Sequence, residues 1–108
     1  MTENTPLWEI LVPRCANSGL EYEVGYHRQW DDRVREIARG VTILHTAKGQ
    51  WRDPSDGAIF VEEMIPVRVY CTEPQIDEIM ELTLKHYDQR AVMAYLVSER
   101  VKILYGEN

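Results

Sequence analysis

The order in which strand-like and helix-like segments follow one another restricts the fold of this chain more than any other sequence feature. Apolar residues recur every second position in some segments and every third or fourth in others, as in strands and helices respectively. The strand-like segments are residues 7–12, 41–52, 58–71 and 91–105, the last with a polar interruption at 98–100. The helix-like segments are residues 26–39 and 72–88. This order predicts two right-handed βαβ crossovers, which place both helices on one face of an antiparallel four-stranded sheet.

This arrangement, βαββαβ, is the ferredoxin-like fold of the α+β class. The chain has 108 residues, of which 44% are hydrophobic and 28% charged, and these values are typical of one globular domain. We therefore predict a single ferredoxin-like domain over residues 1–108.

Three local signals refine the prediction. Thr72 and Gln75 have the spacing of a capping box, which begins the second helix. Residues 53–57, Asp-Pro-Ser-Asp-Gly, predict the turn of a hairpin between the second and third strands, with His45 opposite Ile65 and Trp51 opposite Ile59. Pro66 lacks an N–H group, so we expect a bulge, a break or an unpaired position there.

The charge balance argues against nucleic acids and membranes as partners. Twelve Lys and Arg stand against eighteen Asp and Glu, giving a net charge of −6, and the arginines are interleaved with acids. No apolar run reaches the ~20 residues that span a bilayer, and the first residues do not resemble a signal peptide. Together with two isolated cysteines, Cys15 and Cys71, this predicts a cytoplasmic protein.

Alternation along residues 58–71 predicts one covered and one open sheet face. The covered set contains Ile59, Val61, Glu63, Ile65, Val67, Val69 and Cys71. The open set contains Phe60, Met64, Arg68 and Tyr70. Because an exposed face with aromatic residues is uncommon in monomers, we expect a second copy or a small-molecule ligand to cover it, with a homodimer favoured. Trp30 and Trp51 are further candidates for the ligand-binding or interface surface.

Acid–base chemistry has three candidate residues, His27, His45 and Glu63. The three histidines of the chain are widely spaced and no Cys-x-x-Cys occurs, so we predict neither a metal site nor a cofactor. Glu63 falls in the covered set, where a carboxylate is costly unless it is paired. A bulge that turns it outward, a partner such as Arg52 or Arg68, and a functional acid with a raised pKa are the three explanations.

The segments Gly40-Val41-Thr42 and Gly49-Gln50-Trp51-Arg52, followed by Gly57 and Glu63, resemble a small bacterial family of uncharacterised proteins. The whole pattern is also similar to the ferredoxin-like group that includes the PII-type and ACT-type regulatory proteins. That resemblance implies an oligomer that binds a small effector at a subunit interface. The basic phosphate-binding residues of PII-type proteins are missing from this chain, which argues against nucleotide binding.

Two functions follow from these patterns. The first is a cytoplasmic, oligomeric binding or regulatory module, with its ligand or partner at the sheet face or subunit interface. The alternative is a small cofactor-free enzyme that uses histidine and glutamate side chains as acid and base.

Overall fold

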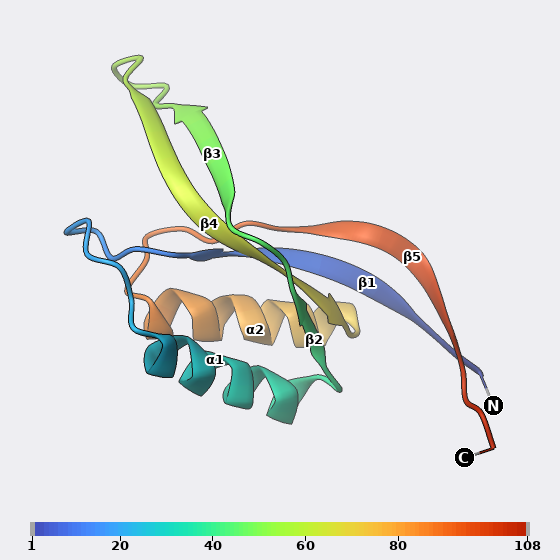
Figure 1. The fold of residues 1–108 in the computed structure, drawn as a ribbon. Helices are drawn as coiled ribbons and strands as arrows, with labels where there is room; N and C mark the ends of the chain where they lie inside the picture. Colours follow the sequence, from blue (N-terminus) through green and yellow to red (C-terminus); the bar gives the residue numbers. More distant parts are fainter. Residues whose placement is uncertain (1, 108) are drawn as a thin grey trace.

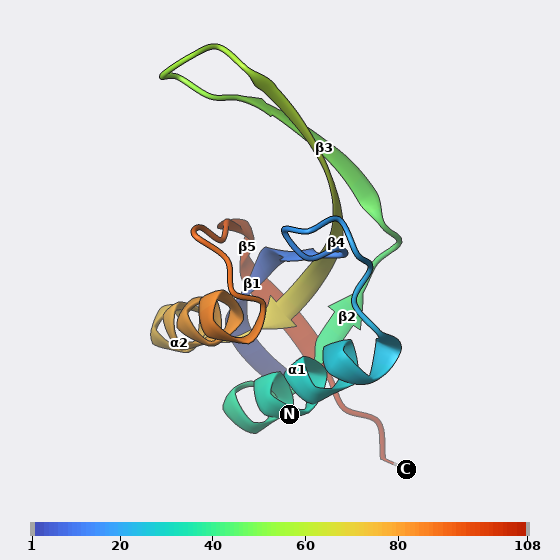
Figure 2. The same cartoon turned by 90° about the vertical axis from the view of Figure 1, so that its left-hand side faces the viewer.

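A computed structural model describes residues 2–107 of the chain and shows an α+β fold. Its elements are β1 (Thr2–Pro13), α1 (Val24–Ile37), β2 (Val41–Ile43), β3 (Ala47–Arg52), β4 (Ile59–Tyr70), α2 (Glu73–His86) and β5 (Ala94–Leu104). The strands form one antiparallel sheet in the order β2-β4-β1-β5, and β3 extends the sheet along β4. Both helices cover the same face of this sheet (Figures 1 and 2). The ferredoxin-like prediction is therefore confirmed, with five strands in place of four.

The fifth strand arises because the predicted strand 41–52 is interrupted opposite Pro66. Val41 pairs with Val69 and Ala47 pairs with Met64, so the register changes by one residue between β2 and β3. The carbonyl of Pro66 accepts a hydrogen bond from the Leu44 N–H at 2.9 Å, but proline has no N–H to return. The expected irregularity thus occurs in the outer strand, where His45 and Thr46 bulge opposite Ile65, and β4 itself is continuous.

The β3–β4 hairpin leaves the sheet beyond this bulge and rises on the side away from the helices (Figures 1 and 2). Its turn is closed by two backbone hydrogen bonds, from the Asp53 N–H to the Ala58 carbonyl and from the Gly57 N–H to the Asp53 carbonyl. Gly57 has a φ of 75°, which suits glycine. Trp51 pairs with Phe60 rather than with Ile59, one residue from the predicted register. The radius of gyration is 15.4 Å, whereas a compact domain of this length has about 13 Å.

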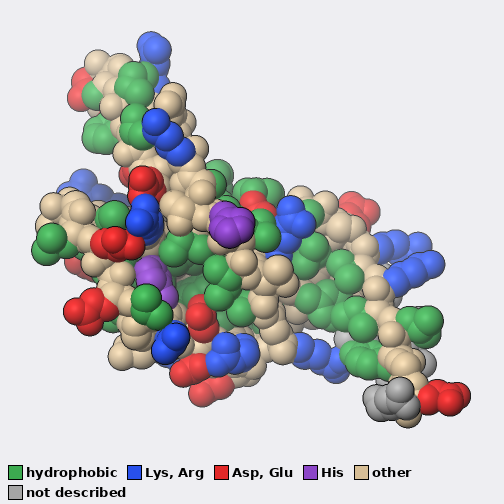
Figure 3. All heavy atoms as spheres, viewed as in Figure 1, with side chains coloured by type: hydrophobic (Ala, Val, Ile, Leu, Met, Phe, Trp, Pro, Cys, Tyr) green, Lys and Arg blue, Asp and Glu red, His purple; other side chains and the backbone are tan. Residues whose placement is uncertain are grey.

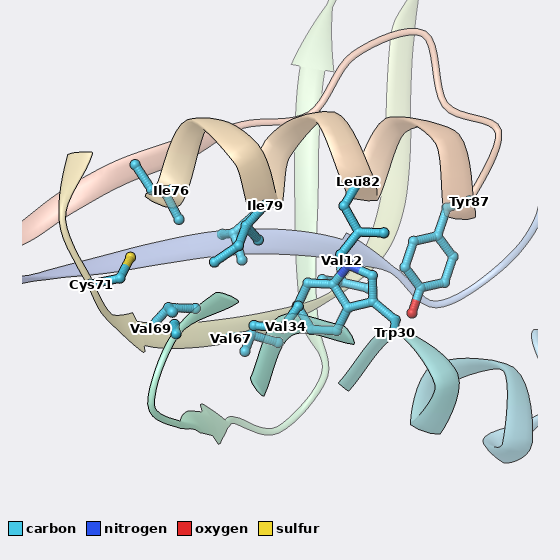
Figure 4. Packing of buried hydrophobic residues seen from close by; sticks show 12 residues of the cluster. Val12, Trp30, Val34, Val67, Val69, Cys71, Ile76, Ile79, Leu82 and Tyr87 are labelled. Atoms are coloured by element: carbon cyan, nitrogen blue, oxygen red, sulfur yellow. The ribbon is translucent and has the colours of Figure 1, made fainter. Parts of the chain in front are cut away.

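The core lies between the sheet and the two helices (Figure 4). β1 contributes Ile10 and Val12, and β4 contributes Val67 and Val69, each at most 2% exposed. The helices add Trp30, Val34, Ile76, Ile79 and Leu82. Ile59 and Val61, which we predicted on the covered face, are both 55% exposed, because the hairpin extends past the helices that would cover them.

The second helix begins as its sequence predicts. The Gln75 N–H donates to the Thr72 side chain, and the Gln75 side chain accepts from the Thr72 N–H. The last strand is one continuous element, although its register against β1 shifts twice. Between β1 and α1 an isolated antiparallel bridge joins Cys15 and Glu21, and α1 begins at Val24.

A buried polar contact joins the two helices. The Trp30 indole N–H donates to the Thr83 hydroxyl at 3.0 Å, and that hydroxyl donates to the Ile79 carbonyl at 2.6 Å. Trp30 is 1% exposed and Thr83 is fully buried. Neither group has access to water, so the Trp30 N–H depends on the Thr83 hydroxyl for its acceptor.

An aromatic cluster connects the start of α1 with the end of α2. The Tyr22 hydroxyl donates to the Tyr87 carbonyl at 2.9 Å, and the Tyr26 hydroxyl donates to the His86 carbonyl. The His27 ring nitrogen Nδ1 lies 2.7 Å from the Tyr87 hydroxyl. Burial lowers the pKa of His27 and the like charge of His86 adds to this, while Asp31 and Glu21 act in the opposite direction. The cluster therefore favours the neutral form of the His27 ring.

Replacing Thr83 with valine tests the contact between the helices. Thr83→Val keeps the shape but leaves the Trp30 N–H without an acceptor in the core. We expect a loss of about 1–3 kcal/mol in the free energy of unfolding, measured by urea denaturation. The matched control is Thr46→Val at an exposed position, which should change stability by less than about 0.5 kcal/mol. An equal loss of unfolding free energy in both variants would contradict a stabilising role of the Trp30–Thr83 hydrogen bond.

The lowered pKa of His27 predicts a stability that depends on pH. Below its ordinary pKa of 6.5 the unfolded chain takes up a proton before the folded chain does. The neutral His27 ring therefore contributes fully to the free energy of unfolding above pH 6.5. This contribution is lost as the pH falls towards and through the lower pKa that His27 has in the folded protein. We expect His27→Gln to flatten the dependence of the unfolding free energy on pH between pH 7 and pH 5, whereas His45→Gln, at an exposed site, should not. A slope unchanged in the His27 variant would refute this role.

Candidate binding site on the open sheet face

The open face is the surface of the sheet opposite α1 and α2. On β1 and β4 it carries the residues that alternate with the core positions, because successive side chains point to opposite faces. One cross-strand row, which we call the central row, contains only polar side chains. Its members, in the order of the strands, are Thr42, Arg68, Glu9 and Tyr95.

Glu9 and Arg68 form an ion pair at the middle of the central row. Arg68 Nε lies 3.1 Å from Glu9 Oε1. The Glu9 side chain is 8% exposed and that of Arg68 is 43% exposed. Since β1 is an inner strand of the sheet, Glu9 is flanked on both sides, by Arg68 on β4 and by Tyr95 on β5. The carboxylate is held in place while much of the guanidinium group faces solvent.

Apolar side chains border the central row on both sides. On one side the cross-strand neighbours are Leu11 and Pro66, with Leu44 bonded to the Pro66 carbonyl. On the other side Leu7 pairs with Tyr70. The Tyr70 hydroxyl is buried and has no hydrogen-bond partner among the side chains that the structure describes, those of residues 5–107. The open face therefore combines a charged row with two apolar rows.

The hairpin continues this face beyond the sheet. The Trp51 and Phe60 rings are stacked, with centroids 4.7 Å apart and an interplanar angle of 18°. Trp51 is 47% exposed and Phe60 is 42% exposed. Figure 3 shows hydrophobic side chains at the surface of the hairpin and of the sheet. Apolar side chains are therefore exposed on the projecting arm as well as on the sheet.

Five of the six residues predicted for a ligand-binding or interface surface lie on this one face. They are Trp51, Phe60, Met64, Arg68 and Tyr70, which alternation along β4 and the pairing of β3 bring together. Trp30 is the exception, because it is 1% exposed and belongs to the core. Its prediction as a surface residue is therefore corrected: the apolar face of α1 turns it inward, where Thr83 satisfies its N–H.

The three acid–base candidates lie elsewhere, and no contact joins them within the described chain. His27 belongs to the aromatic cluster between the helix ends. His45 is exposed in the bulge between β2 and β3. Glu63 lies on the hairpin, on the face opposite to Phe60 and Met64. The structure therefore does not bring these three side chains into one pocket.

Glu63 is paired with an arginine that we did not predict. The partner is Arg14, from the segment after β1, and Arg14 Nε also lies 3.2 Å from Glu21 Oε1. The two carboxylates raise the pKa of Arg14. Glu63 needs no bulge to escape burial, because the helices end before they reach it and its side chain is 51% exposed.

Glu9 is a charged residue of the open face that we did not predict as a site residue. The signal was present, because Glu9 is the one charged residue in the apolar run Leu7–Val12. A lone acid in a strand at the centre of a sheet needs a partner. Periodicity does not identify that partner, since Arg68 lies 59 residues away along the chain.

Two other features of the described chain bear on function. Among residues 2–107, no group of three or more His, Cys, Asp or Glu side chains is arranged to hold a metal ion. Within the same range, no helix is both long and apolar enough to cross a membrane.

Comparison with known proteins gives matches of structure only, since no protein-family model and no curated protein sequence matches the chain. CutA from Synechococcus elongatus is 14% identical, with a TM-score of 0.61 over 91% of this chain and 81% of that one. The divalent cation tolerance protein from Thermus thermophilus is 15% identical, with a TM-score of 0.59 over 100% and 87% of the two chains. A phage SAM lyase in complex with S-methyl-5'-thioadenosine is 10% identical, with a TM-score of 0.65 over 94% and 90%.

At these identities the likenesses establish the fold. The CutA neighbours share the ferredoxin-like architecture of the PII-like type, in agreement with the broader resemblance of the sequence. The narrower pattern around Gly40 and Gly49 has no matching family model. The chain therefore has the fold of the CutA proteins and of the phage lyase over nearly its whole length.

Proposed function

We propose that this protein is an oligomeric binding module in which a second copy of the chain packs on the open face. The observation that carries the proposal is the set of exposed aromatic side chains on this side of the molecule: Tyr95 beside the Glu9–Arg68 ion pair, and the Trp51–Phe60 stack on the arm. Monomeric proteins rarely expose large apolar patches. A small molecule held between the copies is the second part of the proposal.

The shape of the molecule supports self-association. The extents of the chain are 54 × 30 × 23 Å, and the hairpin projects without a layer of its own to cover it. β3 and β5 are edge strands, and exposed edges readily pair with another chain. A second copy supplies the missing cover for both the arm and the sheet.

The two cysteines support a reducing compartment for this module, and we propose the cytoplasm. Both Cys15 and Cys71 are free thiols. Cys71 is buried in the core, and burial raises the pKa of its thiol to about 11, so it acts as a small apolar residue.

Phe60→Asp tests the association surface. The substitution places a charge on the exposed part of the arm, away from the core, so it should separate the copies without unfolding the domain. We expect native mass spectrometry to give at least twice 12.7 kDa for the unaltered protein and 12.7 kDa for the variant. Gentle purification also keeps a bound small molecule, which appears as added mass.

The control is Leu20→Asp, since Leu20 is 73% exposed in the segment before α1 and does not belong to the open face. Its assembly should match that of the unaltered protein. A monomer for the unaltered protein at about 100 µM would exclude the proposed function.

A cofactor-free enzyme is the second candidate, and the likeness to the phage SAM lyase favours it. The pair of Glu63 and Arg14 gives a carboxylate held at a fixed place on the hairpin. Glu21 connects this pair with the surroundings of His27, because it influences the pKa of that ring. An acid–base role for Glu63, His27 and His45 needs a substrate or a second copy that brings them together.

S-adenosylmethionine is the substrate with which to test the enzyme. Formation of S-methyl-5'-thioadenosine, followed by liquid chromatography, would support a lyase. Glu63→Gln should then lower the rate at least tenfold, because the substituted side chain cannot accept a proton. Absence of product from the assembled protein would exclude this lyase activity and leave the binding module.

A further inference from the structure

We infer that a hollow at the start of α1 binds a methylated ammonium ion, a cation of the choline class. The hollow lies between residues 16–23, which follow β1, and the first turn of α1, at the left of Figure 1. Its volume is about 300 Å³ and it is open to solvent. None of its described lining residues belongs to a strand, so the inference needs no second copy of the chain and goes beyond the proposed function.

Two tyrosine rings form the aromatic part of the lining. Tyr22 and Tyr26 are stacked with ring centroids 5.2 Å apart, and Tyr26 stacks in turn on His86 at 4.1 Å. Both hydroxyls donate to carbonyls at the end of α2, that of Tyr22 to Tyr87 at 2.9 Å and that of Tyr26 to His86. The rings are therefore held in place before a ligand arrives. Because their hydroxyl protons are already used, they offer a ligand mainly ring surface, which attracts cations.

Carboxylates give the hollow its negative charge. Glu21 and Glu23 both line it, and there is no lysine or arginine among the lining residues that the structure describes. Glu21 shares its charge with Arg14, whose Nε lies 3.2 Å from Glu21 Oε1, and the first turn of α1 adds about half a positive charge. Glu23 therefore decides the balance. It stands at the N-cap of α1, but its side chain is exposed and makes no capping hydrogen bond, so the carboxylate is available to a cation.

The combination of ring surface and carboxylate favours one class of cation. An inorganic cation needs several oxygen ligands at fixed positions, which two exposed carboxylates do not provide. Methyl groups on nitrogen spread the positive charge over an apolar surface, and such a surface fits both the tyrosine rings and the apolar lining residues Ala16 and Leu20. A neutral molecule of the same shape would gain nothing from the charge of Glu23.

The experiment compares choline with 3,3-dimethylbutan-1-ol, in which carbon replaces the charged nitrogen. Each compound is titrated into the full chain, and the backbone amide signals of Tyr22 and Tyr26 are followed by nuclear magnetic resonance. We expect saturable shifts with choline and binding about tenfold weaker for the alcohol. Equal affinity for the two compounds, or no saturable shift up to about 20 mM choline, overturns the inference.

Glu23→Gln tests the charge of the hollow and should weaken choline binding at least about threefold. The matched control is Glu36→Gln, which removes the same charge from an exposed position near the other end of α1. It should bind choline as the unaltered protein does. Equal weakening in both variants would show a general attraction to an acidic protein and would exclude a site at Glu23.

Tyr22→Leu tests the ring and should weaken choline binding about fivefold or more. Tyr22→Phe is its control, because it keeps the ring and loses only the hydrogen bond to the Tyr87 carbonyl. Equal affinities of the two variants would contradict binding to the ring. If Tyr22→Leu fails to fold, Glu23→Gln still reports, since the Glu23 side chain is exposed.

The same cation occurs free and as the headgroup of phosphatidylcholine, and sedimentation with phosphatidylcholine vesicles separates the two sources. A protein that responds to choline and stays in the supernatant binds the free cation. A protein that responds to choline and sediments with the vesicles binds the headgroup. Sedimentation without a response to choline overturns the inference. Phe60→Asp, which tests assembly, should leave choline binding unchanged, so the failure of either proposal is distinguishable from that of the other.

Discussion

The pairing of β1 with β4 is the constraint on which the rest of the structure depends. These are the two inner strands, and their register runs without interruption from Leu7 opposite Tyr70 to Pro13 opposite Met64. It places Ile10 and Val67 under the helices and, one position along, Glu9 beside Arg68 on the open face. A slip of one residue would turn one strand over relative to the other, and would bring one of the two charges to the covered face and the core residues of that strand to the open face. The fold and the candidate site are therefore consequences of a single register.

The open face has the properties of a surface that is completed by something else. An ion pair on an open sheet adds little to stability, since solvent screens it and the carboxylate loses much of its hydration. Its position between two apolar rows has a clearer use in recognition. Any partner that excluded water from this row would interact more strongly with the same two charges, because the effective dielectric constant would be lower.

The hairpin shows how a small change in the backbone decides what is exposed. Pro66 interrupts the bonding of the outer strand, the register changes by one residue, and β3 and β4 continue as an arm beyond the helices. Trp51 consequently stacks on Phe60 on the same side as Met64. The other side of the arm carries Glu63, and the segment after β1 supplies Arg14 to pair with it. The two sides of one hairpin therefore serve the binding proposal and the enzyme proposal separately.

Local patterns in the sequence determined the order of the elements, the cap of α2, the hairpin turn and the alternation that groups Phe60, Met64, Arg68 and Tyr70. Each of these depends on residues close together along the chain. The tertiary structure alone decided how far the helices cover β4, which is why Ile59 and Val61 are exposed and Glu63 needs no burial. It also decided the pairing of Glu9 with Arg68 and the burial of Trp30 against Thr83. The alternation of apolar and polar residues predicts which face of the sheet a side chain points to. Whether that face is covered, and by which residues, is decided by elements that are distant in the sequence.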